Sequence, residues 1–314
     1  MLQVLNSLHD LASDQRFSLT IGNFDGVHLG HQYLLKKLKY FCDRNKLQLV
    51  VMTFHPHPQE ILGIASPFQY LNTREEKLQR LEQYGVNIVI EVPFNRDLST
   101  ISAKDFIENC ILVHPGLKKL TLGHDFAFGA NKEGNHFFVK KFWQEHASLV
   151  ASIELEVEDK FELNSELISS TFIRKLLLEG NIRKANSFLA QNYELEGLVV
   201  KGDGRGRTIG FPTANMNYSV NKCLPSRGVY STITKYKDET FISLTNIGLN
   251  PTFLDQKVLR VETHLLNFTK DIYGESIKVY FIDRIRDEIK FSNVDSLITQ
   301  IANDIKYRIN ENKE

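Results

Sequence analysis

The stretch "IGNFDGVHLGHQYLLKKL" (residues 21–38) decides the fold of the first half of the chain. The segment "FSLT" before it is apolar enough to be the end of a buried strand, and the apolar residues after it recur at helical spacing. Gly22 and Gly26 let the backbone of the intervening turn approach a ligand closely. A glycine-rich turn from a strand into a helix is a typical phosphate site, because backbone N–H groups and the helix dipole both face the anion.

Two histidines stand at the start of this helix, three residues apart. His28 and His31 can both donate hydrogen bonds to phosphate oxygens, and Gly30 leaves the space between the two imidazoles open. Spacing alone leaves an alternative, in which the turn is only tight and both histidines are solvated. Other segments of the chain have to decide between the two interpretations.

The composition is that of a neutral globular protein. The 314 residues suffice for two domains, hydrophobic residues make up 42% and charged residues 24%, and 38 basic residues balance 38 acidic ones. This balance gives no electrostatic case for a nucleic-acid surface. No apolar run approaches the ~18 residues of a transmembrane helix, and the N-terminal segment lacks the pattern of a signal peptide. We therefore expect a cytoplasmic protein with no membrane or nucleic-acid partner and with three reduced cysteines, Cys42, Cys110 and Cys223.

The first half alternates strands and helices. Strands are predicted at residues 17–22, 47–54, 86–92, 118–123 and 151–158. Between them, Thr73 and Glu76 form a capping box, and Ser102 is placed to cap another helix. This alternation is typical of an open α/β sheet with right-handed crossovers.

The second half consists mainly of strands with period-two alternation. They are predicted at residues 193–200, 228–236, 240–248, 258–268 and 276–282. One amphipathic helix closes the chain, in which Leu297, Ile298, Ile301 and Ile305 share a face. A small antiparallel β-barrel with a terminal helix is the expected fold. The boundary is expected within residues 181–192, which gives domains of residues 1–185 and 186–314.

Two further segments of the first half place polar residues at the end of a strand and the start of a helix. In "LGHDFAFG", Asp125 follows a strand, where open α/β sheets bind ligands. In "ISSTFIRKLLLEG", hydroxyls and Arg174 gather at a helix N-terminus and make a second anion clamp. Taken alone, the second segment also fits a well-capped helix.

The segments "GNFDGVHLGH", "GHDFAFG" and "ISSTFIR", in this order, resemble the adenylylating domain of bacterial bifunctional riboflavin kinase/FAD synthetases. The histidine pair is similar to the H-x-G-H signature of the nucleotidylyltransferase superfamily, so the resemblance implies a Rossmann-like nucleotidylyltransferase domain. It also implies ATP with its phosphates over His28 and His31, and an FMN phosphate that attacks the α-phosphorus while pyrophosphate leaves. By the same resemblance His28, His31 and Arg174 are catalytic. The implied ATP site comprises Gly22, Asn23, Phe24, Asp25, Gly26, His28, Gly30, His31, Asp125, Ser169, Ser170, Thr171 and Arg174.

The chain departs from the family pattern at two positions of this domain. Ala127 stands where the family commonly has Arg, so one positive contact is expected to be missing. In "TFHPHP", His55 replaces an acidic residue of the family segment. His55 and His57 would need further ligands to hold a metal, and a loop that faces the flavin or the nucleotide is the preferred interpretation.

The stretch "GLVVKGDGRGRTIGFPTAN" (residues 197–215) is the most specific in the chain. Its glycines make a flexible loop and its arginines can bring positive charge to a phosphate, but no G-K-[ST] follows, so it is not a P-loop. Thr213 and Asn215 offer oxygen ligands suited to Mg²⁺ on a nucleotide. The stretch matches the riboflavin kinase signature, and "SRGVYS", "TNIGLNPTF", "VETHLLNF" and "DIYG" follow in family order.

The resemblance to riboflavin kinases implies a second site, which uses ATP with Mg²⁺ and riboflavin. FMN is then the product of one site and, with ATP, the substrate for FAD at the other. The implied ATP and flavin residues are Gly202, Gly204, Arg205, Gly206, Arg207, Gly210, Phe211, Pro212, Thr213, Asn215, Asn246, Gly248 and Glu262, with Thr213 and Asn215 as metal ligands.

The alternation in "VLRVETHLL" separates two faces of one strand. Val261, Thr263 and Leu265 share one face, and Arg260, Glu262 and His264 the other. Glu262 is the expected general base for the 5′-hydroxyl of riboflavin. Without the family it would be taken for a solvated strand residue, and His264 is the next candidate for the base. Asn267 stands where the family often has Asp, which puts only a secondary contact in doubt.

Two other functions remain open at this stage. A relative of class I aminoacyl-tRNA synthetases would share the H-x-G-H motif, but "ISSTFIR" lacks the lysines of K-M-S-K-S and no basic RNA-binding domain follows. A flavin-binding regulator without catalysis would be expected to lose residues such as His28, Thr213 and Glu262, which are all present. A turnover assay separates the enzyme from the regulator.

Overall fold

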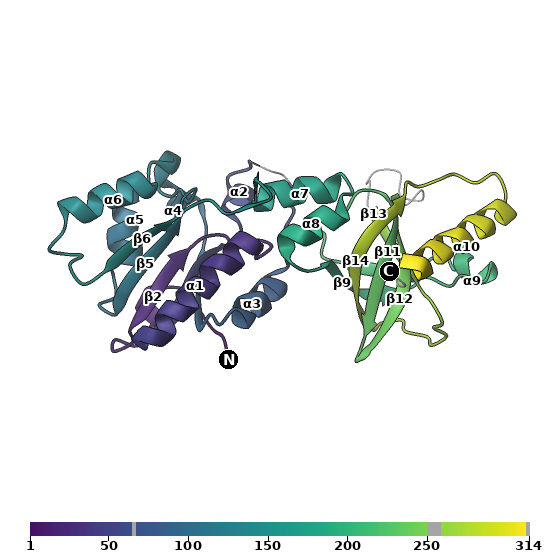
Figure 1. The fold of residues 1–314 in the computed structure, drawn as a ribbon, viewed down its shortest axis with the longest axis horizontal. Coiled ribbons are helices and arrows are strands. Elements are labelled where there is room, and N and C mark those ends of the chain that lie inside the picture. The colour runs from purple at the N-terminus through teal and green to yellow at the C-terminus, as the bar shows by residue number, and fades with distance from the viewer. Residues whose placement is uncertain (65–66, 250–258, 312–314) are drawn as a thin grey trace. The chain divides into compact units, whose positions relative to one another are not determined.

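The computed structural model describes residues 1–64, 67–249 and 259–311. The chain divides into two compact units, Met1–Ser170 and Thr171–Glu314, which are described separately (Figure 1). The end of the predicted stretch "TNIGLNPTF", residues 250–253, lies outside the described residues. Within them, no helix combines the length and the apolar character needed to cross a membrane.

The first unit is built on a six-stranded sheet in which every neighbouring pair is parallel. The strand order is β1-β4-β3-β2-β5-β6. The strands are β1 (Gln3–Leu5), β2 (Phe17–Ile21), β3 (Gln48–His55), β4 (Ile88–Pro93), β5 (Leu117–Gly123) and β6 (Glu154–Glu158). The order reverses between β2 and β5, which is the switch point of a doubly wound sheet. The predicted α/β class and its five strands are confirmed, and β1, which is only three residues long, was not predicted.

Helices cover both faces of this sheet (Figure 1). They are α1 (Leu29–Asn45), α2 (Pro58–Ile61), α3 (Arg74–Gln83), α4 (Arg96–Thr100), α5 (Ala103–Phe106) with a π-helical continuation (Ile107–Ile111), and α6 (His136–Glu145). Short 3₁₀ turns (Leu8–Asp10, Ala130–Lys132) and a hairpin, β7 (Glu162–Leu163) with β8 (Glu166–Leu167), complete the unit.

Period-two alternation gives the sheet two separate cores. Leu49 and Val51 of β3 pack with Leu35 and Leu38 of α1, whereas Val50 of β3 packs in the opposite core with α5 and α6. All of these side chains are at most 9% exposed, as a parallel sheet covered on both faces requires. The capping box at Thr73 and the Ser102 cap are both present as predicted.

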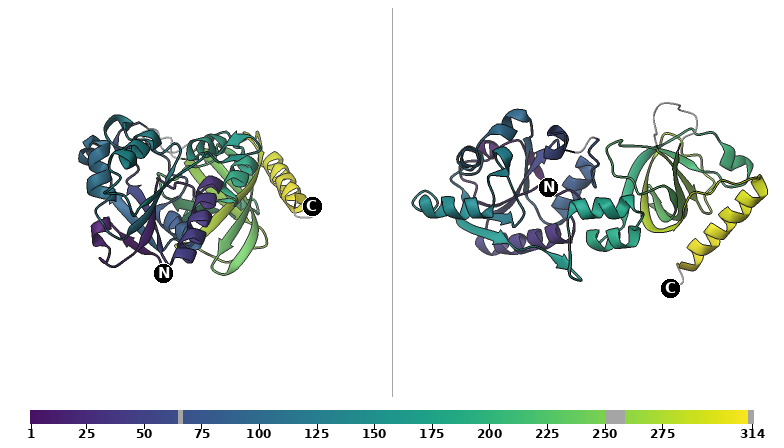
Figure 2. Two further views of the ribbon diagram at one scale, coloured as in Figure 1. Left: turned by 60° about the vertical axis from the view of Figure 1, so that its left-hand side comes forward. Right: turned by 90° about the horizontal axis from the view of Figure 1, so that it is seen from above.

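The second unit is a closed antiparallel barrel with flanking helices, shown from two further sides in Figure 2. The strand order around the barrel is β10-β13-β12-β11-β14-β9. The strands are β9 (Tyr193–Val200), β10 (Ala214–Tyr218), β11 (Gly228–Tyr236), β12 (Glu239–Leu249), β13 (Leu259–Leu265) and β14 (Ser276–Arg286). The helices are α7 (Ser170–Leu178), α8 (Ile182–Leu189), α9 (Arg205–Thr208) and α10 (Val294–Glu311). The predicted barrel and terminal helix are confirmed, whereas β10 was missed because "PTAN" has the composition of a loop.

The barrel interior mixes apolar side chains with a row of hydroxyls. Thr232 bonds to Ser243 (2.8 Å) and Thr245 (2.9 Å), and Thr245 bonds to Thr263 (3.0 Å). Each of these residues is 0% exposed. Because the hydroxyls satisfy one another, the polar groups can stay in the core without water.

Helix α8 is joined to the barrel by the side chain of Asn186. Its amide donates to the carbonyl of Phe281 in β14 (2.8 Å) and accepts from the backbone N–H of Tyr193 in β9 (2.8 Å). These contacts place α8 in the second unit. The division between the two units, at residues 170/171, therefore lies upstream of the predicted boundary at 185/186. The boundary at which the barrel folds alone stays a prediction.

We expect the fragment 171–314 to be more stable than the fragment 186–314. The shorter fragment cuts α8 and removes the buried Ile182 (1% exposed) and Ala185 (0%). Burying an isoleucine side chain contributes about 2 kcal/mol, so the free energy of unfolding should drop by at least that amount. Urea denaturation of the two fragments measures the difference. Equal unfolding midpoints would contradict this result and support the boundary at 185/186.

Candidate active sites

The first site lies where β2 and β5 leave the sheet. The chain leaves β2 at Ile21 and turns toward α1, and it leaves β5 at Gly123 and turns toward Asp125. Ile21 pairs with Leu122, so the two carboxyl ends are neighbours. At this point open α/β sheets form the crevice that binds their ligands. The structure thus brings the loop 22–30 and the exposed Asp125 to the same edge of the sheet.

The loop between β2 and α1 has a preorganised backbone. Phe24 has φ 50°, Gly26 has φ 85° and Val27 has φ 40°. Left-handed backbone costs a non-glycine residue roughly 1–2 kcal/mol. The side chains of Phe24 (1% exposed) and Val27 (0%) are buried, and this packing holds the loop in place. Such strain is concentrated at functional sites.

The two histidines form one stacked and buried pair. The ring centroids of His28 and His31 are 3.7 Å apart with an interplanar angle of 17°, and Phe24 lies against His31 at 4.8 Å. Neither Nδ1 atom has a hydrogen-bond partner among the described residues, although both atoms are buried. His28 also caps α1 without a side-chain bond to the first turn. Unpartnered imidazoles beside a helix N-terminus are suited to an anion, and the burial of both Nδ1 atoms speaks against two fully solvated histidines.

Burial keeps both imidazoles neutral. It lowers the pKa of His28 to about 4, against the opposing charge of Asp25. Burial, reinforced by the neighbouring His28, holds the pKa of His31 well below its usual value. Gly30 lets the pair pack closely, since a Cβ there would meet Phe161 at 3.2 Å and the His28 ring at 3.4 Å. The pair therefore offers neutral N–H groups to an anion near pH 7.

Asp25 joins three segments of the first unit. Its carboxylate, 3% exposed, accepts the backbone N–H of Leu71 (3.0 and 3.1 Å) and of Asn72 (3.2 Å). Its carbonyl accepts the hydroxyl of Ser170 (2.7 Å). Asp25 thus connects the loop after β2 to the segment before α3 and to Ser170 by hydrogen bonds.

A buried lysine that the sequence did not single out supports the same loop. Lys77 of α3, 8% exposed, donates to the hydroxyl of Thr53 at 3.2 Å, and Thr53 donates to the carbonyl of Asn23 at 3.2 Å. Burial lowers the pKa of Lys77, although Glu91 and Asp25 oppose the shift. Lys77, Thr53 and Asn23 could not be linked from the sequence, because they meet only when α3 packs on the sheet.

The remaining predicted residues of this site belong to other segments of the chain. Ser169 and Ser170 end the first unit, whereas Thr171 and Arg174 follow on α7 and are counted with the second unit, so their roles stay predictions. Ala127 is exposed, four residues after the end of β5 at Gly123. Its effect on activity stays a prediction.

His57 is used structurally. Its Nδ1 accepts the backbone N–H of Gln59 at 3.1 Å, and its ring stacks on Phe68 at 4.1 Å. The hydroxyl of Tyr70 accepts the N–H of His57 at 2.9 Å and donates to Glu60. In the described ranges, no group of three or more His, Cys, Asp or Glu side chains could hold a metal ion.

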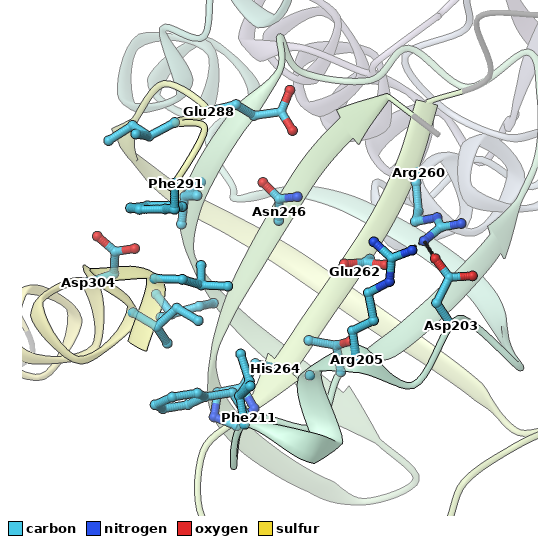
Figure 3. A pocket seen from close by; sticks show the side chains of 18 of the residues that line it. Asp203, Arg205, Phe211, Asn246, Arg260, Glu262, His264, Glu288, Phe291 and Asp304 are labelled. Atoms are coloured by element: carbon cyan, nitrogen blue, oxygen red, sulfur yellow. Dashed lines mark hydrogen bonds and ion pairs between the residues drawn. The ribbon is translucent and has the colours of Figure 1, made fainter. Parts of the chain in front are cut away.

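The second site is a cavity of about 360 Å³ on the outside of the barrel (Figure 3). The loop before β10, the outer faces of β12 and β13, the segment after β14 and α10 enclose it. The predicted residues that line it are Gly204, Arg205, Gly206, Phe211, Thr213, Asn215, Asn246 and Glu262. Gly202, Arg207, Gly210, Pro212 and Gly248 are not among its lining residues.

The glycine-rich loop is folded back on itself. The N–H of Phe211 donates to the carbonyl of Gly206 at 2.8 Å, and the loop contains the short helix α9. A Cβ at Gly202 would lie 2.2 Å from the amide nitrogen of Asn215, and one at Gly206 would lie 2.3 Å from the Phe211 carbonyl. Glycine is needed at both positions because of these close approaches.

The predicted division of β13 into two faces is confirmed. Val261, Thr263 and Leu265 are at most 5% exposed inside the barrel. Arg260, Glu262 and His264 face the cavity (Figure 3).

The wall opposite Glu262 is apolar and comes from the end of the chain. Arg286 of β14 holds Asp304 of α10 with both nitrogens of its fork (2.7–3.1 Å), and Asp304 is 3% exposed. The side chains of Ile289, Phe291, Leu297 and Ile301 line this wall. Only the helical periodicity of α10 could be predicted, because a pair 18 residues apart on two elements has no local signature.

The oxygen donors in the cavity suit Mg²⁺ that arrives with a phosphate ligand. Asn215 of β10 pairs with Glu262 of β13, and Thr213 lines the same cavity. Hydroxyl, amide and carboxylate oxygens are the ligands that Mg²⁺ prefers, and it usually takes only one or two from the protein. These residues therefore fit the predicted metal, which would bind together with a nucleotide.

Acidification is predicted to destabilise the first unit through His28. The folded pKa is about 4 and the ordinary value is 6.5. The unfolded chain therefore takes up this proton first, so the stabilising contribution of neutral His28 is complete above pH 6.5 and is lost as the pH falls to 4, a total of about 3 kcal/mol. We expect the free energy of unfolding to fall less steeply over this range in His28→Gln. His9→Gln, at an exposed position, is the matched control, and an unchanged slope in His28→Gln would refute the assignment.

Family models match both halves of the chain. A model described as FAD synthetase matches residues 10–172, and one described as riboflavin kinase matches residues 189–310. The bifunctional riboflavin kinase/FMN adenylyltransferase of Listeria monocytogenes is 36% identical over 91% of this chain and 89% of its own length. Those of Haemophilus influenzae (36%, covering 97% of each chain) and Escherichia coli K12 (35%, covering 96% of each) are similar over the whole length.

A solved structure shows the same fold. The crystal structure of a protein named as a macrolide-efflux protein from Streptococcus pneumoniae has a TM-score of 0.88 and 29% sequence identity, and covers 98% of this chain and 99% of its own. Two matching family models in the predicted order, and relatives that agree over nearly the full length, lead to one conclusion. The chain belongs to the family of bifunctional riboflavin kinase/FMN adenylyltransferases.

Proposed function

We propose that this chain makes FAD from riboflavin in two steps, one in each unit. The second unit transfers a phosphoryl group from ATP to riboflavin, and the first transfers the adenylyl group of a second ATP to FMN. The observation that supports the proposal is that each unit gathers some motif residues of one activity: His28 and His31 stack beside α1 in the first unit, and Thr213, Asn215 and Glu262 line one cavity in the second. Family membership sets aside the aminoacyl-tRNA synthetase interpretation, and we place the enzyme in the cytoplasm.

In the kinase step, the 5′-hydroxyl of riboflavin attacks the γ-phosphorus of ATP, and ADP leaves. Glu262 accepts the hydroxyl proton in this proposal. Its side chain lines the cavity together with the glycine-rich loop, which suits this role. Arg205 extends from the loop into the cavity and can neutralise phosphate charge (Figure 3). His264 is the next candidate for the base, since the bond from its Nδ1 to the carbonyl of Pro212 leaves Nε2 to accept a proton.

The two unlike walls of the cavity suit the two halves of riboflavin. The apolar side chains near α10, such as Phe291 and Ile301, offer a surface for a flat aromatic ring. The polar wall with Asn246 and Glu262 suits the ribityl hydroxyls. Mg²⁺ bound with ATP supplies charge neutralisation on the phosphates, and Thr213 and Asn215 are the residues that would hold it.

In the adenylyl step, a phosphate oxygen of FMN attacks the α-phosphorus of ATP, and pyrophosphate leaves. The stacked His28 and His31 donate neutral hydrogen bonds to the polyphosphate, beside the N-terminus of α1. Arg174 adds positive charge in this proposal. Asp25 acts by holding the loop, since backbone N–H groups occupy its carboxylate.

Incubation of the chain with riboflavin, ATP and Mg²⁺ is expected to give FMN first and FAD later. Chromatography of timed samples measures both products. FMN without FAD would mean that the first site is inactive, with Ala127 as the position to restore to Arg. Bound flavin without either product would instead favour the flavin-binding regulator.

Single substitutions should separate the two activities. Glu262→Gln keeps the size of the side chain but cannot accept a proton, so riboflavin phosphorylation should fall by about 10²–10⁴-fold. His31→Ala removes a donor to the polyphosphate and should lower FAD formation by about 10²–10³-fold. Each variant should keep the other activity, assayed with supplied FMN for the adenylyl step. Equal loss of both activities in either variant would show that the residue is structural.

A further inference from the structure

We propose that Arg260 and His264 are positioning residues of the kinase site, which hold the two ends of the glycine-rich loop over Glu262. The inference rests on the proposed kinase function of this cavity. Neither residue belongs to the set that the sequence motifs implied for ATP or flavin. Their place follows from the alternation of β13, which sends the side chains of residues 260, 262 and 264 to the same outer face.

Arg260 holds the start of the loop. Its Nη1 donates to Oδ2 of Asp203 at 3.0 Å and to Oε1 of Glu262 at 3.3 Å (Figure 3). Asp203 stands between Gly202 and Gly204, so its carboxylate is the first side-chain anchor of the loop. One guanidinium thus connects the loop to the residue proposed as the base.

His264 holds the end of the loop. Its Nδ1 lies 2.7 Å from the carbonyl oxygen of Pro212. A carbonyl can only accept, so Nδ1 carries the proton. The ring of His264 also meets Phe211 edge-on, with centroids 5.7 Å apart. The anchors at Asp203 and Pro212 therefore enclose the whole loop, and Glu262 lies between the two residues that hold them.

Internal hydrogen bonds tie the parts of the loop together, so two anchors can place it. They join Arg207 to Gly204 (3.1 Å) and Phe211 to Gly206 (2.8 Å). The three glycines between the anchors, however, give an unanchored loop further conformations, and ordering it costs conformational entropy. Anchors made before ATP arrives remove part of that cost. Loss of an anchor should therefore raise the KM for ATP and lower kcat, because the phosphates and Glu262 are no longer aligned.

The first experiment measures riboflavin phosphorylation by Arg260→Met and His264→Leu at saturating riboflavin. We expect kcat/KM for ATP to fall about 10-fold in each variant, as for the loss of one hydrogen bond to a charged or buried group. Arg260→Lys and His264→Gln, which keep a donor, should recover part of the loss. Lys270→Met, which breaks an exposed ion pair with Glu239 of similar length (2.7 Å), is the matched control and should leave the rate unchanged.

A double-mutant cycle separates the two contacts of Arg260. Asp203→Asn weakens the anchor and leaves the contact between Arg260 and Glu262 in place. If Arg260 acts through the loop, Asp203→Asn should reproduce much of the fall in kcat/KM for ATP that Arg260→Met causes. The double variant should then be little slower than Arg260→Met alone. Additive effects, or a wild-type rate in Asp203→Asn, would overturn the role of this anchor.

Hydrogen exchange of residues 203–212 tests the anchors without turnover. We expect faster exchange of these amides in Arg260→Met and His264→Leu, with the rest of the barrel unchanged. Unchanged exchange in both variants would overturn the inference even if the rates fall. A wild-type chain that does not phosphorylate riboflavin would count against the proposed function alone, and FMN adenylylation in every variant serves as the check that the chain is folded.

Discussion

Parallel strands must end on the same edge of their sheet, and the first site depends on this constraint. β2 and β5 are neighbours in space but send the chain to opposite faces, so nothing in the sheet fills the gap between their ends. The loop with the histidine pair and the segment with Asp125 enter that gap because they follow these two strands. The buried Phe24 and Val27 then hold the loop at positive φ, so the imidazoles are placed before any ligand binds.

The second site depends on a different rule, the alternation of a barrel strand. The interior of this closed barrel is filled by buried side chains, which leaves its ends and its outer face for a ligand. β13 uses the outer face, since its inner residues are committed to the core and its outer ones to the cavity. The buried hydroxyls also connect these two strands on the inner face. Thr245 and Thr263 bond to each other behind Asn246 and Glu262, which pair on the outside of the same two strands.

Local patterns were enough for most of the fold. Apolar runs gave the parallel strands, period two gave the barrel strands and both faces of β13, and the capping box at Thr73 marked a helix start. Two strands were not predicted. β1 is too short to show a period, and β10 includes residues of "PTAN", whose composition indicates a loop. Pairing with β9 and β13 makes β10 a strand, which is a tertiary effect.

The state of the site residues could be predicted less well than their positions. The histidines were predicted as hydrogen-bond donors, and the sequence does not display the burial that lowers the pKa of both imidazoles. Asp25 was predicted to lie at the nucleotide, which stays a prediction, and the sequence does not show that its carboxylate accepts from Leu71 and Asn72, some 46 residues away. Arg260 carried no motif signal, since its partner Asp203 lies 57 residues before it. Long-range partners of this kind require the folded chain.

The bidentate pair between Arg286 and Asp304 has a consequence for protein synthesis. The apolar wall of the cavity is fastened by Asp304 of α10, so the ribosome must have synthesised the chain at least as far as this residue before the wall can close. The crevice between β2 and β5 is finished much earlier, because β5 ends at Gly123. A growing chain therefore assembles its two sites in the reverse of the order in which the substrate needs them.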